Sequence, residues 1–191
     1  FIYNGEDHLS PGHLRDCWFL DSGAEMCHYW LGEENTIKNT VHNKIFYQER
    51  KSLLSLFSFF CHNANIVNNI FVELLDKKAE CRLNSISVLN GRSSVKHKIK
   101  IQHSSPHCFS EQLYKGVYAG ASTGEFDSVV TVEKNSQKTI AKQKNSNMLI
   151  SDLARVQSNP QLEIFADDVE CAHGSTIGQI DDSALFYLRS R

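Results

Sequence analysis

Hydrophobic and polar residues alternate with a period of two along most of the chain. Between positions 95 and 101, Val95, Ile99 and Ile101 alternate with lysines. Such alternation is typical of a strand with one buried face. Four other runs repeat it: Ile70 to Leu74, Ile86 to Val88, Val130 to Val132, and Leu162 to Ile164. The chain is therefore predicted to form short strands, each burying the apolar residues of its run.

Polar turns separate these runs at intervals of roughly ten residues. The predicted turns are residues 63–65, 76–78, 90–92 and 145–147. Such spacing fits a β-sandwich, a barrel or a β-solenoid. Three prolines and ten glycines are few for so many turns, and Asn-Gly hairpin signals are rare. These features favour a parallel solenoid with small polar corner residues, but the pattern alone leaves all three architectures open.

The last residues change in character from strand to helix. Asp181 and Asp182 precede an apolar run and can cap a helix, where early acids also suit the helix dipole. We therefore predict a β-rich core over residues 1–180 and the start of a helical region over residues 181–191. Because the first residue is Phe1 and not methionine, we expect the chain to be a fragment of a longer protein.

Composition excludes several classes of function. The net charge of -2 and pI of about 6.5 argue against a partner nucleic acid or an anionic membrane surface. The longest apolar run, residues 53–61, is too short to span a bilayer. Six scattered cysteines without a C-x-x-C pair indicate neither a disulfide scaffold nor a structural zinc site, and they fit a reducing cytoplasm. The sequence contains no Walker-type loop for ATP hydrolysis.

The second half of the chain contains several long motifs. Residues 160–178 read PQLEIFADDVECAHGSTIG, and residues 185–191 read LFYLRSR. Residues 103–110 have the pattern H-x-x-P-x-C-x-S, and residues 113–117 have the pattern L-x-K-G-V. Together these motifs resemble the SufD family of iron–sulfur cluster assembly subunits, whose pattern reads P-Q-L-E-I-x-A-D-D-V-x-C-x-H-G-A-T-x-G and continues with L-F-Y-L-R-S-R. Two departures are Ser175 in place of alanine and Asp127-Ser128 in place of Asn-Gly, where we expect a different turn.

The resemblance implies a right-handed parallel β-helix flanked by helical regions. It also implies a non-catalytic scaffold subunit that pairs with a homologous SufB-like subunit and with a SufC-like ABC ATPase. The ATPase is expected to dock through a C-terminal helical region beyond these residues. A transient iron–sulfur cluster is expected at the subunit interface, with no cofactor held stably by this chain alone. An alternative pairing is a homodimer of the isolated chain.

Cys171 and His173 are the candidate cluster residues. A strand places them on one face with Cα atoms roughly 6–7 Å apart, close enough to serve one soft-metal site. Iron–sulfur clusters take about four protein ligands, so a partner subunit must supply the others. The resemblance implies that His173 faces the partner. In the alternative interpretation, Cys171 is a small buried apolar residue and His173 a hydrogen-bonded core or interface histidine.

Other chemically active residue types have simpler structural explanations. Asp167 and Asp168 resemble the paired aspartates of β-helical polysaccharide enzymes, but adjacent strand residues point to opposite faces and cannot converge. We expect a solvated or turn-forming pair. Further groupings are His103, His107 and Cys108, expected in a turn around Pro106 with Cys108 buried, and Cys17, Cys27 and His28, expected in core or interface packing.

Two other functions remain open at this point. A SufB-type paralogue would carry more of the cluster ligands itself, and its sequence pattern lacks the Cys-x-His-Gly-x-Thr motif of residues 171–176. A polysaccharide-processing enzyme would need a groove with carboxylates from several coils.

Overall fold

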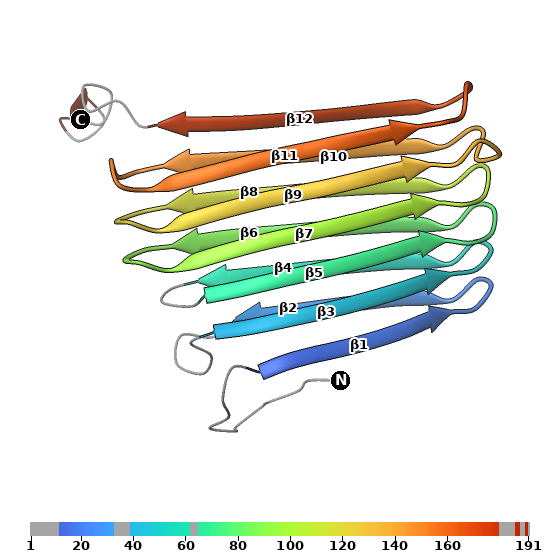
Figure 1. The fold of residues 1–191 in the computed structure, drawn as a ribbon, viewed down its shortest axis with the longest axis horizontal. Coiled ribbons are helices and arrows are strands. Elements are labelled where there is room, and N and C mark those ends of the chain that lie inside the picture. The colour runs from blue at the N-terminus through green and yellow to red at the C-terminus, as the bar shows by residue number, and fades with distance from the viewer. Residues whose placement is uncertain (1–11, 33–38, 62–64, 180–185, 188–189, 191) are drawn as a thin grey trace.

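The computed structural model describes residues 12–32, 39–61, 65–179, 186, 187 and 190. Strands fill most of this part of the chain (Figure 1). They are β1 (Gly12–Leu20), β2 (Glu25–Gly32), β3 (Asn39–Gln48), β4 (Leu53–Cys61), β5 (Asn65–Leu74), β6 (Glu80–Leu89), β7 (Ser94–His103), β8 (Phe109–Tyr118), β9 (Thr123–Val132), β10 (Ile140–Leu149), β11 (Arg155–Ile164) and β12 (Glu170–Gln179).

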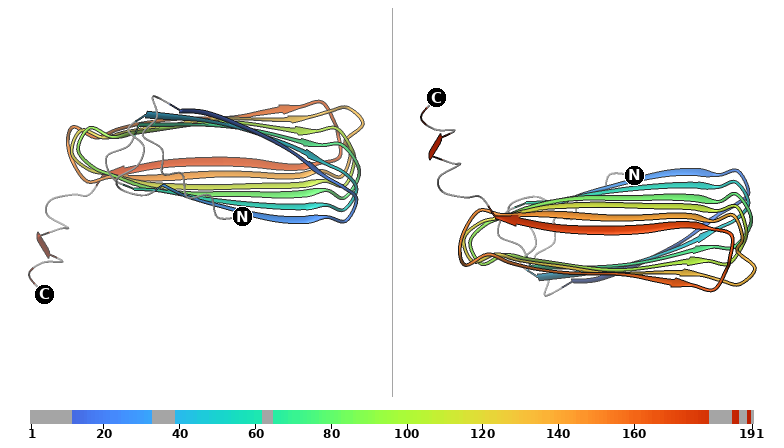
Figure 2. Two further views of the ribbon diagram at one scale, coloured as in Figure 1. Left: turned by 90° about the horizontal axis from the view of Figure 1, so that it is seen from below. Right: turned by 90° about the horizontal axis from the view of Figure 1, so that it is seen from above.

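Odd-numbered and even-numbered strands form two separate parallel sheets. Sheet A has the order β1-β3-β5-β7-β9-β11, and sheet B has the order β12-β10-β8-β6-β4-β2. Each coil of the chain therefore adds one strand to each sheet, and the two sheets face each other as flat layers (Figure 2). The register pairs Gly12 with Thr40 and Thr123 with Arg155. The predicted parallel β-helix is confirmed.

Alternate residues of every strand face the space between the sheets. In sheet A, one row across adjacent strands consists of Phe46, Val72, Ile101 and Val130, all fully buried. In sheet B, Leu54, Cys81, Ser110 and Ala141 form a row of progressively smaller side chains. Burial of such apolar rows stabilises the fold by about 25 cal/mol per Å² removed from water. The main core cluster extends along the solenoid, from Leu20 to Ala166.

The predicted burial of apolar residues is wrong on two strands. On β11, Ile164 was predicted to be buried but is 41% exposed, because it lies near the open end of the solenoid. On β6 the apolar residues Ile86 and Val88 face outward, with 36% and 42% of their surface exposed, while Ser85 and Ser87 face inward. Ser85 lies beside Tyr114 of β8, whose buried ring fills the interior at that level, so a small side chain fits there.

Two predicted turns are strand interiors instead. Asn145 and Asn147 point inward from β10, with 4% and 7% of their surface exposed. The Asn147 Nδ2 donates to Asn145 Oδ1 at 2.5 Å, and Asn145 Nδ2 donates to the Tyr114 carbonyl at 3.4 Å. Asp127 and Ser128 likewise lie in the middle of β9, so the departure from Asn-Gly alters no turn.

One corner of the solenoid repeats an unusual backbone conformation. Gly23, Lys51, Lys78, His107 and Lys138 each follow a sheet A strand and have φ between 56° and 76°. The next residue in the four later coils is small and buried: Ser52, Ala79, Cys108 and Thr139. Backbone bonds join these corners, as from His107 N to Gln137 O at 2.9 Å. The predicted turn at residues 76–78 lies at one of these corners, and long side chains stand beside the small polar residues that were expected at the others.

The predicted helical region at 181–191 lies outside the described residues except for positions 186, 187 and 190, which are too few to test it. Among the described residues, the structure contains no helix of the length and apolar character needed to cross a bilayer.

Lys44 is an unexpected charge inside the solenoid. Its side chain points inward from β3, is 2% exposed, and has its Nζ 4.1 Å from the Trp30 ring centroid. This Nζ has no hydrogen-bond partner among the described residues. Burial lowers the pKa of Lys44 to about 8, while Asp16 on the neighbouring strand partly opposes that shift. The alternating polar residues Thr40, His42 and Lys44 were a signal for this interior cluster that sequence reasoning missed.

Replacing Lys44 with methionine is expected to raise the free energy of unfolding by about 1 kcal/mol at pH 7, because it removes a buried unpaired charge. The gain should shrink as the pH rises from about 8 toward 10.5. Over that window the buried lysine has lost its proton while the unfolded one keeps it, so the native protein gains stability with pH. Urea denaturation at several pH values measures this, with Lys115→Met on the exposed face of β8 as control. A variant less stable than the native protein would contradict the prediction.

Candidate functional site

Strand β12, which carries Cys171 and His173, is the terminal strand of sheet B. Within the described residues it pairs only with β10, from Ile140↔Glu170 to Leu149↔Gln179. Strand β11 is likewise the last strand of sheet A, so both sheets end at the same end of the solenoid (Figure 1). One row of β12 backbone N–H and C=O groups is therefore left for another strand to bind.

Cys171 and His173 both follow the inward-facing rows of sheet B. Cys171 lies beside Ala141 and His173 beside Gln143, and both β10 residues are buried. Cys171 is half-buried and packs against the main core, whereas His173 is exposed because no further coil covers β12 in the described chain. The predicted shared face is thus present, and it opens at the end of the solenoid.

The Cys171 thiol is in a partly apolar environment. Desolvation raises its pKa, and a hydrogen bond with the Ala141 backbone partly offsets this effect. A raised pKa keeps the thiol protonated at neutral pH, so Cys171 becomes a metal ligand only when the metal displaces that proton.

A hydrogen-bonded row of polar side chains leads inward from the level of His173. Gln143 Nε2 donates to Ser128 Oγ at 3.0 Å, and Ser128 Oγ donates to Gln112 Oε1 at 2.7 Å. Across the two layers, Ser175 Oγ donates to Ser158 Oγ at 2.8 Å. The first two bonds hold the buried polar side chains next to His173 in place. The third bond joins β12 to β11, the last strands of the two sheets.

The two terminal strands differ in how they protect their edges. Strand β11 contains Pro160, which has no N–H to offer, together with Arg155. Strand β12 contains no proline, lysine or arginine, its one acidic residue is Glu170 at its first position, and glycines stand at 174 and 178. Proline and charge are common means of blocking an edge. The strand with the candidate residues is therefore the more open edge for strand addition.

Asp167 and Asp168 lie in the turn before β12, as expected for a structural acid pair. Asp168 forms an ion pair with Lys138, and its backbone N–H donates to Gln137 Oε1 at 2.9 Å. The Lys138 N–H in turn donates to the Asp168 carbonyl at 2.6 Å. These bonds fasten the last corner to the coil below, which accounts for Asp168 without catalysis.

The remaining predicted groupings are not brought together as metal sites. Cys108 and His103 are buried, with His103 Nε2 2.8 Å from Ser110 Oγ, while His107 is exposed in the turn after Pro106. Cys17 and Cys27 are exposed, so they do not pack in the core, and their packing at an interface stays a prediction. His28 does pack, edge-on to Trp18 with ring centroids 5.6 Å apart. The described part of the chain contains no group of three or more Cys, His, Asp or Glu residues suited to a metal ion.

Comparison with known proteins finds similarity to iron–sulfur cluster assembly proteins. Residues 17–191 match the family model described as SUF system FeS cluster assembly, SufBD core domain. The chain is 33% identical over 171 residues to the iron–sulfur cluster assembly protein SufD of Escherichia coli, covering 89% of this chain and 40% of that protein. It is 33% identical over 126 residues to a SufBD family protein of Synechocystis, covering 65% of this chain and 27% of that protein.

A third relative is described as chloroplastic, from Arabidopsis thaliana, with 27% identity over 173 residues, covering 90% of this chain and 36% of that protein. The chain therefore spans less than half the length of these relatives. The match over residues 17–191 includes nearly all of the solenoid, and with it both candidate residues. By its sequence and its parallel β-solenoid, this chain belongs to the SufBD family of SUF-system iron–sulfur cluster assembly proteins.

Proposed function

We propose that this chain is the core of a SufD-type scaffold subunit that pairs through β12 with a homologous SufB-like subunit. The observation that carries the proposal is the open edge of β12, which is unblocked by proline, lysine or arginine and bears Cys171 and His173. Backbone pairing across such an edge gives affinity, while the side chains on either side of it give specificity.

The nascent cluster is cargo at this interface. Two ligands from one chain are insufficient for a cluster that takes about four, and this fits a site completed by the partner subunit. His173 is exposed at the open end and provides an imidazole ligand. Cys171, half-buried and two residues before it on the strand, is the secondary ligand. A SufC-like ATPase is the third component, and the cytoplasm is the expected compartment.

The scaffold role is favoured over the polysaccharide enzyme by the acid pair at the last corner. The Asp168 carboxylate is engaged by Lys138, and the carboxylates of an acid–base pair must instead converge on a sugar. Compared with a SufB-type subunit, this chain offers only the Cys171 and His173 pair at the open end that the structure describes.

The test is anaerobic co-expression of the full-length protein with its SufB-like and SufC-like partners, comparing the native protein with His173→Ala and Cys171→Ser. We expect all three complexes to assemble, with iron and sulfide lost in His173→Ala and reduced in Cys171→Ser. His107→Asn, an exposed histidine in a corner turn, is the control and should retain the cluster. Unchanged iron and sulfide in His173→Ala would refute its ligand role, and failure of the native protein to co-purify would refute the pairing.

A further inference from the structure

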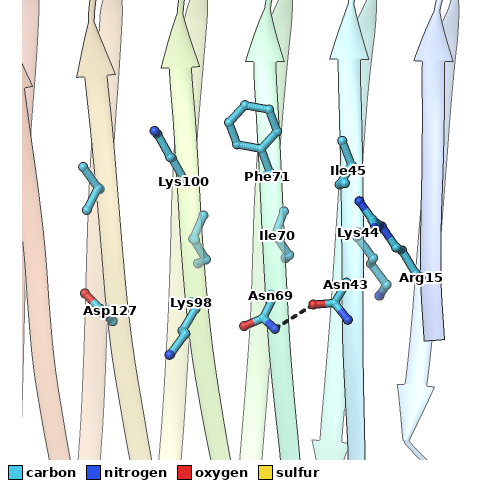
Figure 3. A pocket seen from close by; sticks show the side chains of 12 residues that line it. Arg15, Asn43, Lys44, Ile45, Asn69, Ile70, Phe71, Lys98, Lys100 and Asp127 are labelled. Carbon is cyan, nitrogen blue, oxygen red and sulfur yellow. Dashed lines mark hydrogen bonds between the residues drawn. The ribbon is translucent and has the colours of Figure 1, made fainter. Parts of the chain in front are cut away.

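The outer face of sheet A carries a shallow groove that is separate from the β12 edge. It has a volume of about 460 Å³ and crosses the strands from β1 to β9. Figure 3 shows one row of its outward side chains, which lie side by side on successive strands. This row is Arg15, Asn43, Asn69, Lys98 and Asp127.

The groove has an excess of unpaired positive charge. Arg15, Lys98 and Lys100 are exposed, and none forms an ion pair with a residue in the described ranges. By contrast, the neighbouring Lys96 is neutralised by Glu125 at 2.5 Å. Asp127 is the single carboxylate among the lining residues that the structure describes. The groove is thus complementary to a ligand with at least two negative charges.

The middle of the groove offers hydrogen-bonding groups between the cations. Asn69 Nδ2 donates to Asn43 Oδ1 at 2.8 Å, as the dashed line in Figure 3 marks. This bond orients both amides. The Asn69 Oδ1 accepts no hydrogen bond from the described part of the chain and can accept one from a peptide N–H.

A second outward row runs alongside the first and consists of Ile45, Phe71, Lys100 and Val129 on β3, β5, β7 and β9. Its three apolar members are half-buried, and Lys100 lies between Phe71 and Val129. The adjacent Ile45 and Phe71 suit the apolar side chains of a peptide. Single-stranded nucleic acids are held mainly on successive aromatic faces, and the described groove lining contains only one such ring, Phe71. The lining therefore favours a peptide among anionic ligands.

The distance between Arg15 and Lys98 determines how far apart two carboxylates of a bound peptide would lie. Arg15 on β1 and Lys98 on β7 are three strand positions apart in sheet A, which corresponds to about 14 Å. An extended peptide covers that distance in about four residues. We propose that this groove binds an extended acidic segment of a partner protein, with two carboxylates about four residues apart and apolar side chains between them.

Fluorescence anisotropy with a labelled synthetic peptide tests the proposal on the full-length protein. The probe contains two glutamates four residues apart with leucines between them, and a second peptide has glutamines in their place. We expect the acidic peptide to bind at least about tenfold more tightly than the glutamine peptide, and more weakly as salt rises. Lys98→Glu combined with Lys100→Glu, and separately Arg15→Glu, should each weaken binding about tenfold or more.

The matched control is Lys142→Glu combined with Lys144→Glu, an exposed pair two residues apart on the outer face of sheet B. It should bind the acidic peptide as the native protein does. Three results would overturn the proposal: no binding by the native protein, equal binding of the two peptides, or equal loss in the control. Tighter binding of an oligouronate or of single-stranded DNA, lost on Lys98→Glu with Lys100→Glu, would also overturn it and assign the groove to that ligand class instead. The outcome is independent of the role of His173.

Discussion

Acidification from pH 7.5 to about 5 is expected to cost the solenoid about 4 kcal/mol through the buried His97 and His103. His28 and His42 add to this loss, because burial lowers their pKa values to about 4 and about 3. Burial lowers the pKa of His97 to about 3 and that of His103 to about 4, and both are almost fully shielded from water. Because the folded pKa lies below the unfolded value, the native state has this stability in full above about pH 6.5 and loses it as the pH falls toward 4. Each histidine contributes about 2 kcal/mol by pH 5.

Urea denaturation at pH 7.5, 6 and 5 measures this loss, and His97→Phe isolates one contribution. His97 packs between Phe60 and Tyr114, with ring centroids 5.5 Å and 4.9 Å away, so a phenyl ring fits the same space. The variant should lose about 2 kcal/mol less than the native protein between pH 7.5 and 5. His107→Asn, at an exposed corner, should keep the native pH dependence. An identical dependence in His97→Phe would show that His97 is protonated without penalty.

Replacing Gly124 with alanine is expected to cost about 3 kcal/mol of folding free energy. A Cβ at this position would lie 2.3 Å from the Tyr118 Oη and 2.4 Å from its Cζ. The Tyr118 side chain is 4% exposed. Its ring also lies over Gly116, where an added Cβ would be 2.3 Å from the Tyr118 Cε2. The ring therefore has no direction in which to move freely, and either the ring or the β9 backbone must shift.

A double-mutant cycle with Tyr118→Leu distinguishes the clash with the tyrosine ring from any other effect of replacing Gly124. In the Tyr118→Leu background the alanine at position 124 should cost less than about 1 kcal/mol, because the shorter side chain leaves room for it. Gly174→Ala is the control, since an added Cβ there would meet no heavy atom within 4 Å, and it should change stability by less than about 0.5 kcal/mol. Equal penalties with and without the tyrosine ring would contradict the explanation.

Strand positions were predictable from local alternation, but the architecture was not. The runs near Ile70, Val95 and Val130 lie in strands because period two is a local property. Their partners lie a whole coil away, as Gly12 and Thr40 illustrate, so alternation cannot distinguish a solenoid from a sandwich. The resemblance of residues 160–178 to a known family supplied that information. The buried face of β6 was misassigned because the interior there accepts serine beside Tyr114.

The candidate site was predictable in part. A strand of period two placed Cys171 and His173 on one face, and the structure agrees. Their accessibility depends instead on the absence of a covering coil among the described residues, which no local pattern encodes. The left-handed conformation of Lys51, Lys78, His107 and Lys138 was also missed, because lysine has no preference for that conformation and only the stacking of corners imposes it.

The repeated corner has a consequence for the length of the subunit. Lys78 and His107 share one backbone conformation, and each is followed by a small buried residue, Ala79 or Cys108. A deletion of residues 79–107 would therefore join two equivalent corners and remove one complete coil. Each coil adds about 4.8 Å along the stacking direction, so proteins built on this plan change length in discrete steps. The number of coils, and not the length of any strand, fixes how far the buried Lys44 cluster lies from the open edge at His173.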